Sequence, residues 1–394
     1  MPCVLLIFAS CHKPKHIVSI RKFNEEINGW SSNLLTLFRI AFTSAYAFTG
    51  FGSPLSCRIS GSRFNHKGAT RHFMSETLSI QDIVDVTYDK YRNVDDGEVA
   101  TYIPELSKAD PRDFAICLVT VDGKVFSAGD WEKEFTLQSI CKPFAFQMSL
   151  EEFGREGTLA RVGVEPSGDA FNSIELDPRT MRPFNPMVNA GAIAVASLIK
   201  KGSAVAGVRA FVDKMQLAAG RKLKIDSSVL ASESATGNRN RAIAYLMLNF
   251  GIIDEDINHT LHQYFSQCSL LVTCRDLAMM AASLANMGAN PVSGEPVFDF
   301  QYVRDVLAVM FTCGLYDHAG EWAYNVGLPA KSGVGGGLMA VVNRQLGVAV
   351  YSPRLDAKGN SVRGIMVCKE LASRLGLHAF EFTNVGSSFV QSLF

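Results

Sequence analysis

The sequence predicts an α+β protein in which one antiparallel sheet, built from both ends of the globular region, is flanked by helices and interrupted by an inserted all-helical part. Two observations lead to this fold class. Strand-like runs lie at about residues 113–130 and again at about 327–352, whereas residues of about 139–300 have the patterns of helices and loops. Short, uncrossed connections favour uniting the two groups of strands in a single sheet.

The early strands are predicted by 113-DFAICLVTVDGKVFSAGD-130, in which two β-rich runs flank Asp122-Gly123. That dipeptide is a strong short-range signal for a hairpin. Ahead of it, the globular region begins near Leu78 with a helical pattern that continues to Tyr91, and a shorter helical pattern covers Val99–Lys108.

The later elements follow from the same rules of hydrophobic periodicity. Apolar, β-branched runs predict strands at Leu338–Val342 and Leu346–Ser352, separated by the polar turn Asn343–Gln345, and a final helix fits Ser361–Leu375. Five further helices are expected in the middle of the chain, at Ala190–Lys201, Val205–Ala219, Asn240–Phe250, Ile257–Cys268 and Thr273–Met287.

The bulk composition excludes several classes of partner. Formal net charge is zero, so the chain has no electrostatic means of capturing nucleic acid or anionic lipid, and we expect a small-molecule substrate. No uninterrupted apolar stretch reaches the roughly 18 residues of a membrane span. The nine cysteines are widely spaced without a Cys-x-x-Cys pair, and the eight histidines form no His-Glu-x-x-His motif. We therefore expect no metal, no disulfide framework and a reducing compartment.

Charge is distributed unevenly along the chain. Residues 1–74 carry nine basic and two acidic side chains, a charge of +7, which leaves −7 for the remainder. A basic, serine-rich and acid-poor leader is typical of an organelle transit peptide, and the alternative is an upstream extension before Met74. We therefore predict a basic extension over 1–75, a catalytic domain over 76–379 and a C-terminal tail over 380–394. The predicted location is intracellular: cytoplasmic, or mitochondrial if the leader is a transit peptide.

A serine three residues ahead of a lysine is the strongest catalytic motif. It occurs four times, at Ser10/Lys13, Ser19/Lys22, Ser139/Lys142 and Ser197/Lys200. Only Ser139 follows the predicted hairpin and opens a helix, because Pro143 is tolerated only near a helix start. A helix start offers amide donors to an oxyanion, and a buried, neutral Lys142 one turn further can take the proton of the serine hydroxyl. Alternatively, Ser139 is a helix N-cap and Lys142 a surface lysine.

A second motif, 330-AKSGVGGGL-338, precedes a predicted strand. Its glycines are expected to let a substrate approach the strand backbone closely. A Ser-x-x-Lys at a helix start and a Lys-Ser/Thr-Gly on a late strand together are typical of the penicillin-recognising serine hydrolases. The combination favours an enzyme.

Longer stretches resemble the serine-dependent glutaminases, from about Gly97 to Leu377. The matching blocks are YIPEL (102–106), LQSICKP (137–143), VEPSGDAFNS (164–173), NPMVNAGAI (185–193), SESATGNRN (232–240), FTCGLYDHAG (311–320), GLPAKSGVGGG (327–337) and LDAKGNSVRG (355–364). The resemblance implies a β-lactamase/transpeptidase-like fold and the hydrolysis of L-glutamine to L-glutamate and ammonia without a cofactor. It also implies a homo-oligomer, a dimer or a tetramer.

Carried over by position, the resemblance implies that Ser139 is the nucleophile, Lys142 its general base and Tyr264 a proton relay. The backbone amides of Ser139 and Val334 would form the oxyanion hole. The substrate-binding positions that it implies are Tyr102, Gln138, Ser139, Asn189, Glu233, Asn240, Tyr264, Tyr316 and Val334. Among these, Glu233 suits the α-ammonium group of glutamine, and Lys331 is expected to act structurally or electrostatically.

Two rival functions stay open on the sequence alone. One is a β-lactamase or D,D-peptidase-like serine hydrolase on the same fold. That enzyme would be exported, whereas the apolar run Val4–Ala9 is short and has no basic residue before it. The other is a non-catalytic glutamine-binding paralogue, against which the intact set of Ser139, Lys142 and Tyr264 argues.

Overall fold

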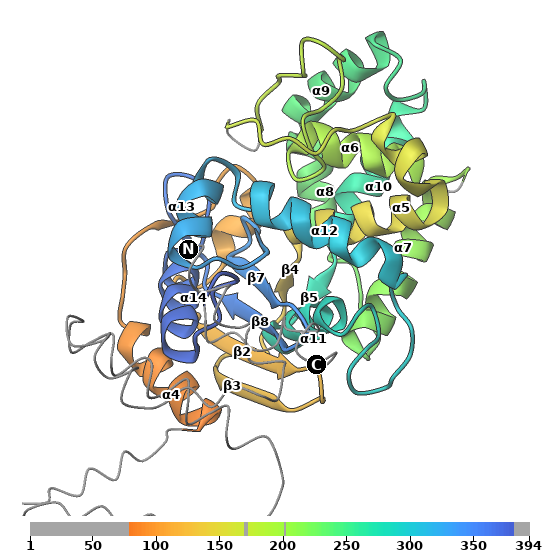
Figure 1. Ribbon diagram of the computed structural model, residues 1–394. Helices are drawn as coiled ribbons and strands as arrows, with labels where there is room; N and C mark the ends of the chain where they lie inside the picture. The colour runs from red at the N-terminus through yellow and green to blue at the C-terminus, as the bar shows by residue number, and fades with distance from the viewer. Residues whose placement is uncertain (1–78, 169–171, 201, 382–394) are drawn as a thin grey trace, which may run out of the picture. The chain divides into compact units, whose positions relative to one another are not determined.

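Five antiparallel strands form the main sheet, in the order β3-β2-β8-β7-β6 (Figure 1). The computed structural model describes residues 79–168, 172–200 and 202–381. Strand β2 pairs along its whole length with β8, from Ala115 opposite Tyr351 to Thr120 opposite Leu346. This pairing unites the early and late strands, so the predicted sheet built from both ends is confirmed. The strands are β2 (Ala115–Thr120), β3 (Val125–Gly129), β6 (Ala330–Ser332), β7 (Gly337–Val342) and β8 (Leu346–Tyr351).

The predicted hairpin is the connection between β2 and β3. Val119 pairs with Val125, and the turn between the two strands contains Asp122 and Gly123. Gly123 has a φ of +83°, a left-handed conformation that glycine adopts without steric cost. The turn chemistry of the sequence was therefore sufficient to predict this element.

Both faces of the sheet are buried, which explains the continuous apolar runs of its strands. On β2, Ile116 and Leu118 face one core, and Cys117 and Val119 face the other, as the two-residue period of a strand requires. Helices α4 (Ile80–Tyr91) and α14 (Val362–Leu375) cover the first face, and α11 (Cys274–Ala285) covers the second (Figure 1).

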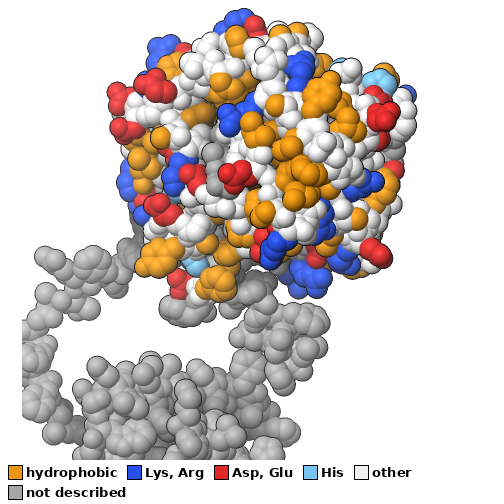
Figure 2. All heavy atoms as spheres, turned by 90° about the horizontal axis from the view of Figure 1, so that it is seen from above, with side chains coloured by type: hydrophobic (Ala, Val, Ile, Leu, Met, Phe, Trp, Pro, Cys, Tyr) orange, Lys and Arg blue, Asp and Glu red, His pale blue; other side chains and the backbone are white. Residues whose placement is uncertain are grey.

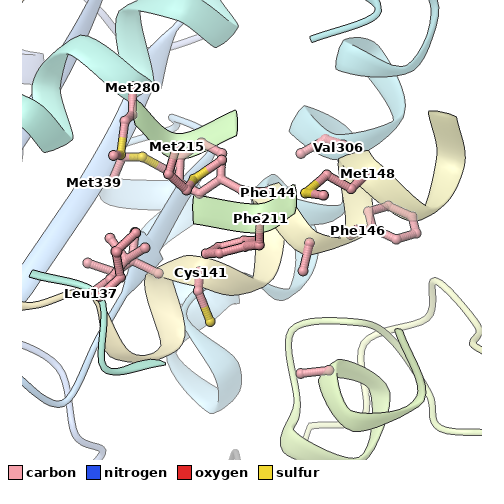
Figure 3. Close-up of a cluster of buried hydrophobic side chains, with 14 of the residues drawn as sticks. Leu137, Cys141, Phe144, Phe146, Met148, Phe211, Met215, Met280, Val306 and Met339 are labelled. Carbon is pink, nitrogen blue, oxygen red and sulfur yellow. The ribbon is translucent and has the colours of Figure 1, made fainter. Parts of the chain in front are cut away.

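In the sequence, the helical part lies between the early and the late strands. In space, it lies beyond α11, as seen from the sheet. Its core joins aromatic and sulfur side chains of several helices, including Phe144 and Met148 of α5 and Phe211 and Met215 of α7 (Figure 3). Its helices are α5 (Cys141–Leu159), α6 (Asn189–Leu198), α7 (Ala204–Ala219), α8 (Ser227–Thr236), α9 (Asn238–Asn249), α10 (Ile257–Cys268) and α12 (Phe300–Cys313).

Two expectations about local structure were wrong. Val99–Lys108 is not one helix: β1 (Glu98–Val99) pairs with β9 (Arg354–Leu355), and only Pro104–Lys108 turns, as a 3₁₀ helix. Proline removes an amide donor and clashes with the preceding turn, so no helix runs through Pro104. The polar segment after Asp226, which is not among the predicted helices, is α8, because the Asp226 carboxylate caps the amides of Ser228 and Val229.

Helical structure also continues past residue 300. Helix α12 begins after Asp299, whose carboxylate accepts a hydrogen bond from the amide of Gln301, and α13 (Ala319–Asn325) follows a short 3₁₀ turn at Tyr316–His318. Neither helix is among those predicted from the sequence.

The predicted leader and most of the predicted tail lie outside the described residues. Within the residues that the structure describes, no helix is both long and apolar enough to cross a membrane. On the face that Figure 2 shows, acidic and basic side chains are interspersed among hydrophobic ones rather than gathered into a single basic surface.

Candidate active site

Ser139 lies where a short strand turns into α5. Strand β4 (Phe135–Thr136) pairs with β5 (Leu271–Val272), and the Leu137 amide continues this pairing with a hydrogen bond of 2.8 Å to the Leu270 carbonyl. The 3₁₀ turn Gln138–Ile140 follows, and α5 begins at the next residue. Gln138 has a φ of +48°, which a side chain other than glycine rarely adopts, so the surrounding packing holds this turn in a strained conformation.

The other Ser-x-x-Lys pairs do not form comparable sites. Ser10 and Ser19 lie outside the described residues. Lys200 donates hydrogen bonds to both carboxylate oxygens of Asp254, at 2.6 and 2.7 Å, and thus forms an ion pair beyond the end of α6.

Lys142 is buried in the protein interior, with 1% of its surface exposed. Its Nζ donates to Asn189 Oδ1 at 2.7 Å and to the Met187 carbonyl at 3.0 Å. Burial lowers the pKa of Lys142 to about 8, since an ammonium group loses hydration in the interior. The amine therefore loses its proton far more readily than a surface lysine.

Two acceptors for Lys142 come from the segment 185-NPMVNAG-191. The Asn185 carboxamide accepts a hydrogen bond from the Met187 amide at 3.0 Å, which fixes the turn that presents the Met187 carbonyl. Helix α6 then starts at Asn189. A Cβ on Gly191 would lie 1.9 Å from the Asn185 carbonyl, so only glycine lets the helix pack this closely on the turn.

The two tyrosines of the site have different partners. The Tyr316 hydroxyl is a hydrogen-bond partner of the Ser139 side chain, whereas the Tyr264 hydroxyl donates to Asn189 Oδ1 at 3.3 Å. Both are buried, and burial raises the pKa of each phenol, so both are protonated at neutral pH. Tyr316 thus interacts with the Ser139 side chain, and Tyr264, to which the family resemblance assigns the relay, lines the same cavity as Ser139.

Lys331 contacts both the hydroxyl and the ring of Tyr316. It is fully buried, donates hydrogen bonds of 2.7 Å to the Tyr316 hydroxyl and to the Ser332 carbonyl, and lies 3.9 Å from the centre of the Tyr316 ring. Lys142 lies 5.7 Å from the same ring. Burial and the positive charge of Lys142 lower the pKa of Lys331 well below its ordinary value.

Glu233 is buried on α8 rather than solvated in a loop. Its pKa is raised to about 7 by burial, and a hydrogen bond from Gln138 and the charge of Lys142 reduce the shift. Oε1 of this carboxylate is buried and has no hydrogen-bond partner within the protein. A buried carboxylate oxygen without a partner is costly unless a ligand satisfies it.

A cavity of about 100 Å³ lies in front of Ser139. Seven predicted positions line it: Tyr102, Gln138, Ser139, Asn189, Glu233, Asn240 and Tyr264. Asn189 Nδ2 donates to Asn240 Oδ1 at 3.0 Å, and Tyr102 stands at the mouth with 54% of its surface exposed. The cavity is also lined by Asn172, Thr236, Arg239 and Cys268, which were not predicted as site residues. The first three lie in the blocks 164–173 and 232–240 that carry the family resemblance, but their places in the lining depend on tertiary packing.

The glycines after Lys331 pack closely on the segment that carries Ser139. A Cβ on Gly333 would lie 3.0 Å from the Leu137 carbonyl, and one on Gly335 would lie 2.9 Å from the Thr136 carbonyl. These glycines therefore allow the loop to approach that segment, and their role in admitting a substrate stays a prediction. Val334 between them lines an adjacent cleft together with Thr136.

Among the described residues, no group of three histidine, cysteine, aspartate or glutamate side chains could hold a metal ion, and six cysteines are free and buried. The chemistry that the arrangement offers is nucleophilic. A serine at a helix start, a buried lysine of lowered pKa and a tyrosine bonded to the serine are the groups that an acyl transfer requires.

An antiparallel sheet joined from both chain ends, with a helical part bearing a Ser-x-x-Lys motif, defines the β-lactamase-like α+β class. Comparison with known proteins then narrows the class. The family model described as Glutaminase matches residues 97–380, and the chain belongs to the glutaminase family.

The relatives and solved structures agree with this assignment. The chain is 54% identical to the glutaminase of Trichormus variabilis over 303 residues, 77% of this chain and 91% of that protein. It is 53% identical to the glutaminase of Microcystis aeruginosa, over 74% of this chain and 87% of that protein. A solved structure of the probable glutaminase ybaS has a TM-score of 0.74 at 39% identity, over 76% of this chain and 98% of that one. The structure of Mglu in its glutamate form has a TM-score of 0.75 at 39% identity, over 78% and 70%.

Proposed function

We propose that this protein hydrolyses L-glutamine to L-glutamate and ammonia through a γ-glutamyl ester on Ser139. The observation that carries the proposal is the buried contact set at the start of α5, in which Tyr316 is bonded to Ser139 and Lys142 is held by two fixed acceptors. Membership of the glutaminase family supports the substrate. Mglu, a structural relative, was solved in its glutamate form, which supports a site shaped for the product.

In the first step, Lys142 acts as the base for Ser139. A neutral lysine amine has two N–H groups and one lone pair. The two hydrogen bonds to Asn189 Oδ1 and the Met187 carbonyl use both N–H groups, so the lone pair remains available for the serine proton. The serine oxygen then attacks the γ-amide carbon, and the amides of Ser139 and Val334 are proposed to hold the oxyanion.

In the second step, Tyr316 delivers a proton to the leaving ammonia. Lys331 donates a hydrogen bond to the Tyr316 oxygen, and the Tyr316 O–H is proposed to donate its proton toward the leaving group. Lys142 then gives the proton that it took from Ser139 to the Tyr316 oxygen, which restores both groups, and water cleaves the ester in the reverse sequence. Tyr264, bonded to Asn189, is proposed to position Lys142 through that amide rather than to carry the proton.

Substrate recognition is assigned to the residues that line the cavity. The unpartnered Oε1 of Glu233 is placed to accept a hydrogen bond from the α-ammonium group of glutamine. Asn240, Tyr102 and Arg239 line the same cavity and supply donors for the α-carboxylate. A charged partner on Glu233 would also relieve the burial cost of that carboxylate.

The proposal is tested by ammonia release from L-glutamine, with L-asparagine as the control substrate. We expect turnover on glutamine, little on asparagine, and loss of turnover in Ser139→Ala while the circular dichroism spectrum and the melting temperature stay those of the parent. Full activity of Ser139→Ala would overturn the mechanism. Hydrolysis of nitrocefin, or covalent labelling of Ser139 by penicillin, would instead favour the penicillin-recognising alternative, and glutamine binding without turnover would favour a non-catalytic paralogue.

We further propose an intracellular homo-oligomer, a dimer or a tetramer. Six buried, free cysteines support a reducing location, since disulfides are rare there. Light scattering of the purified protein at several concentrations measures the assembly, and a concentration-independent monomer would contradict it.

A further inference from the structure

Two thiols that take no part in the proposed reaction lie directly behind the reactive groups. The Sγ atoms of Cys141 and Cys268 are 3.9 Å apart, in contact. Cys141 is the first residue of α5, and Cys268 is the last residue of α10. Figure 3 shows the Cys141 side chain on the first turn of α5. The pair therefore joins the two helices that carry Ser139, Lys142 and Tyr264 into the site.

The pair can be reached from the cavity. Cys268 lines the cavity with Ser139, Glu233 and Tyr264, although only 3% of its surface is exposed, and Cys141 is completely buried behind it. A small oxidant that fits in the glutamine site thus meets Cys268 first. Burial and the neighbouring Cys141 thiol raise the pKa of Cys268, which makes its oxidation slower than that of an exposed thiolate.

Other cysteines of the core are placed differently. The Cys274 thiol donates to the Ala349 carbonyl at 3.3 Å, beside the sheet. Cys368 is buried in the separate core between the sheet and α14. Cys368 is therefore a matched control, since it is equally buried but distant in the fold from the reactive groups.

We propose that Cys141 and Cys268 form a disulfide when the protein meets hydrogen peroxide, and that this bond reversibly switches off the site. Cys268 attacks one peroxide oxygen, which gives a sulfenic acid and releases water. The Cys141 thiol then attacks the sulfenic sulfur, the S–S bond forms, and the sulfenic oxygen leaves as a second water. The peroxide is the oxidant and accepts the two electrons that the thiols lose.

The expected inactivation follows from the geometry. A disulfide holds its sulfur atoms at about 2.05 Å, so the present 3.9 Å must close by roughly 2 Å. Both cysteines lie at helix ends, and Lys142 directly follows Cys141, so part of this movement reaches the base and the nucleophile. A displacement of about 1 Å at reacting groups costs roughly 10²-fold in rate. The size of this effect rests on the proposed roles of Ser139 and Lys142.

The test treats the full chain with hydrogen peroxide and follows ammonia release and the protein's peptide masses. We expect a roughly 10²-fold loss of kcat and a linked peptide pair containing Cys141 and Cys268 that lacks two hydrogen atoms. Dithiothreitol should restore kcat and the separate, unlinked peptides. Saturating L-glutamate should slow the loss, because it occupies the route to Cys268.

Three variants complete the test. In Cys141→Ala and Cys268→Ala, the ratio of treated to untreated activity should stay near one, whereas Cys368→Ala should lose activity as the parent does. Absence of the linked peptide in the oxidised parent overturns the proposal, and this readout holds even if an alanine variant fails to fold. A linked peptide with unchanged kcat refutes the switch. If the untreated protein releases no ammonia, the proposed function fails, and the peptide masses still report whether the bond forms.

Discussion

Replacing each buried tyrosine by phenylalanine tests the assignment of the proton relay. The two substitutions remove one hydroxyl each and keep both rings, so neither opens a large cavity. Tyr316→Phe deletes the hydroxyl that is bonded to Ser139 and accepts from Lys331 at 2.7 Å. Tyr264→Phe deletes a hydroxyl that donates to Asn189 at 3.3 Å.

The structure predicts a different loss of kcat for each substitution. Loss of a general acid costs about 10²–10⁴-fold in rate, equivalent to roughly 3–5 kcal/mol of activation free energy. We expect that loss in kcat for Tyr316→Phe. Lys331 also loses one of its two acceptors in this variant, so the free energy of unfolding of the variant should be lower by about 1–3 kcal/mol. Asn189 keeps its 2.7 Å bond from Lys142 when Tyr264 is replaced, and a neutral hydrogen bond contributes about 1 kcal/mol, so kcat should fall by about tenfold at most.

The assay is ammonia release at saturating glutamine, with urea unfolding of both variants as the control for stability. A burst of γ-glutamyl enzyme detected by mass spectrometry separates acylation from hydrolysis. If Tyr264→Phe loses more kcat than Tyr316→Phe, the reasoning from this geometry is refuted, and Tyr264 is the relay that the family resemblance implies.

Three further predictions concern pH, binding and packing. Because the pKa of Lys142 is about 8, the neutral base is about one tenth populated at pH 7 and about nine tenths at pH 9, so kcat should rise roughly tenfold between them. A flat profile would contradict a lysine base. Glu233→Gln removes the charge assigned to the α-ammonium group, so KM should rise about 30-fold or more. The parent's KM should also rise below pH 7 as this carboxylate protonates. An unchanged KM in the variant would exclude that contact. Gly191→Ala places a Cβ against the Asn185 carbonyl and should lower the free energy of unfolding by about 2–3 kcal/mol. In the control Gly320→Ala in α13, the added Cβ meets nothing within 4 Å, so the free energy of unfolding should change by no more than about 1 kcal/mol. Equal urea midpoints would refute the packing argument.

Local sequence signals were reliable wherever short-range chemistry decides the structure. Asp122-Gly123 determines the hairpin between β2 and β3, since a turn with a positive φ needs glycine. Pro143 restricts the start of α5 to the residues just ahead of it, and α5 begins at Cys141. The same signals failed for α8, where a polar segment without an apolar stripe forms a helix because it is capped by Asp226 and packed against the cavity.

By itself, therefore, the sequence determined the fold class, the position of Ser139 at a helix start and the family to which the chain belongs. The partners of each reactive group were decided by the tertiary structure. Lys142 obtains its lowered pKa from burial and its fixed acceptors from Met187 and Asn189, about 45 residues away in the chain. Tyr264 comes from α10 and Tyr316 from the turn before α13, so the two tyrosines reach the site from segments that are far apart in the sequence. Spacing along a chain fixes which residues share a helix turn, but desolvation and hydrogen bonding depend on which distant segments pack together.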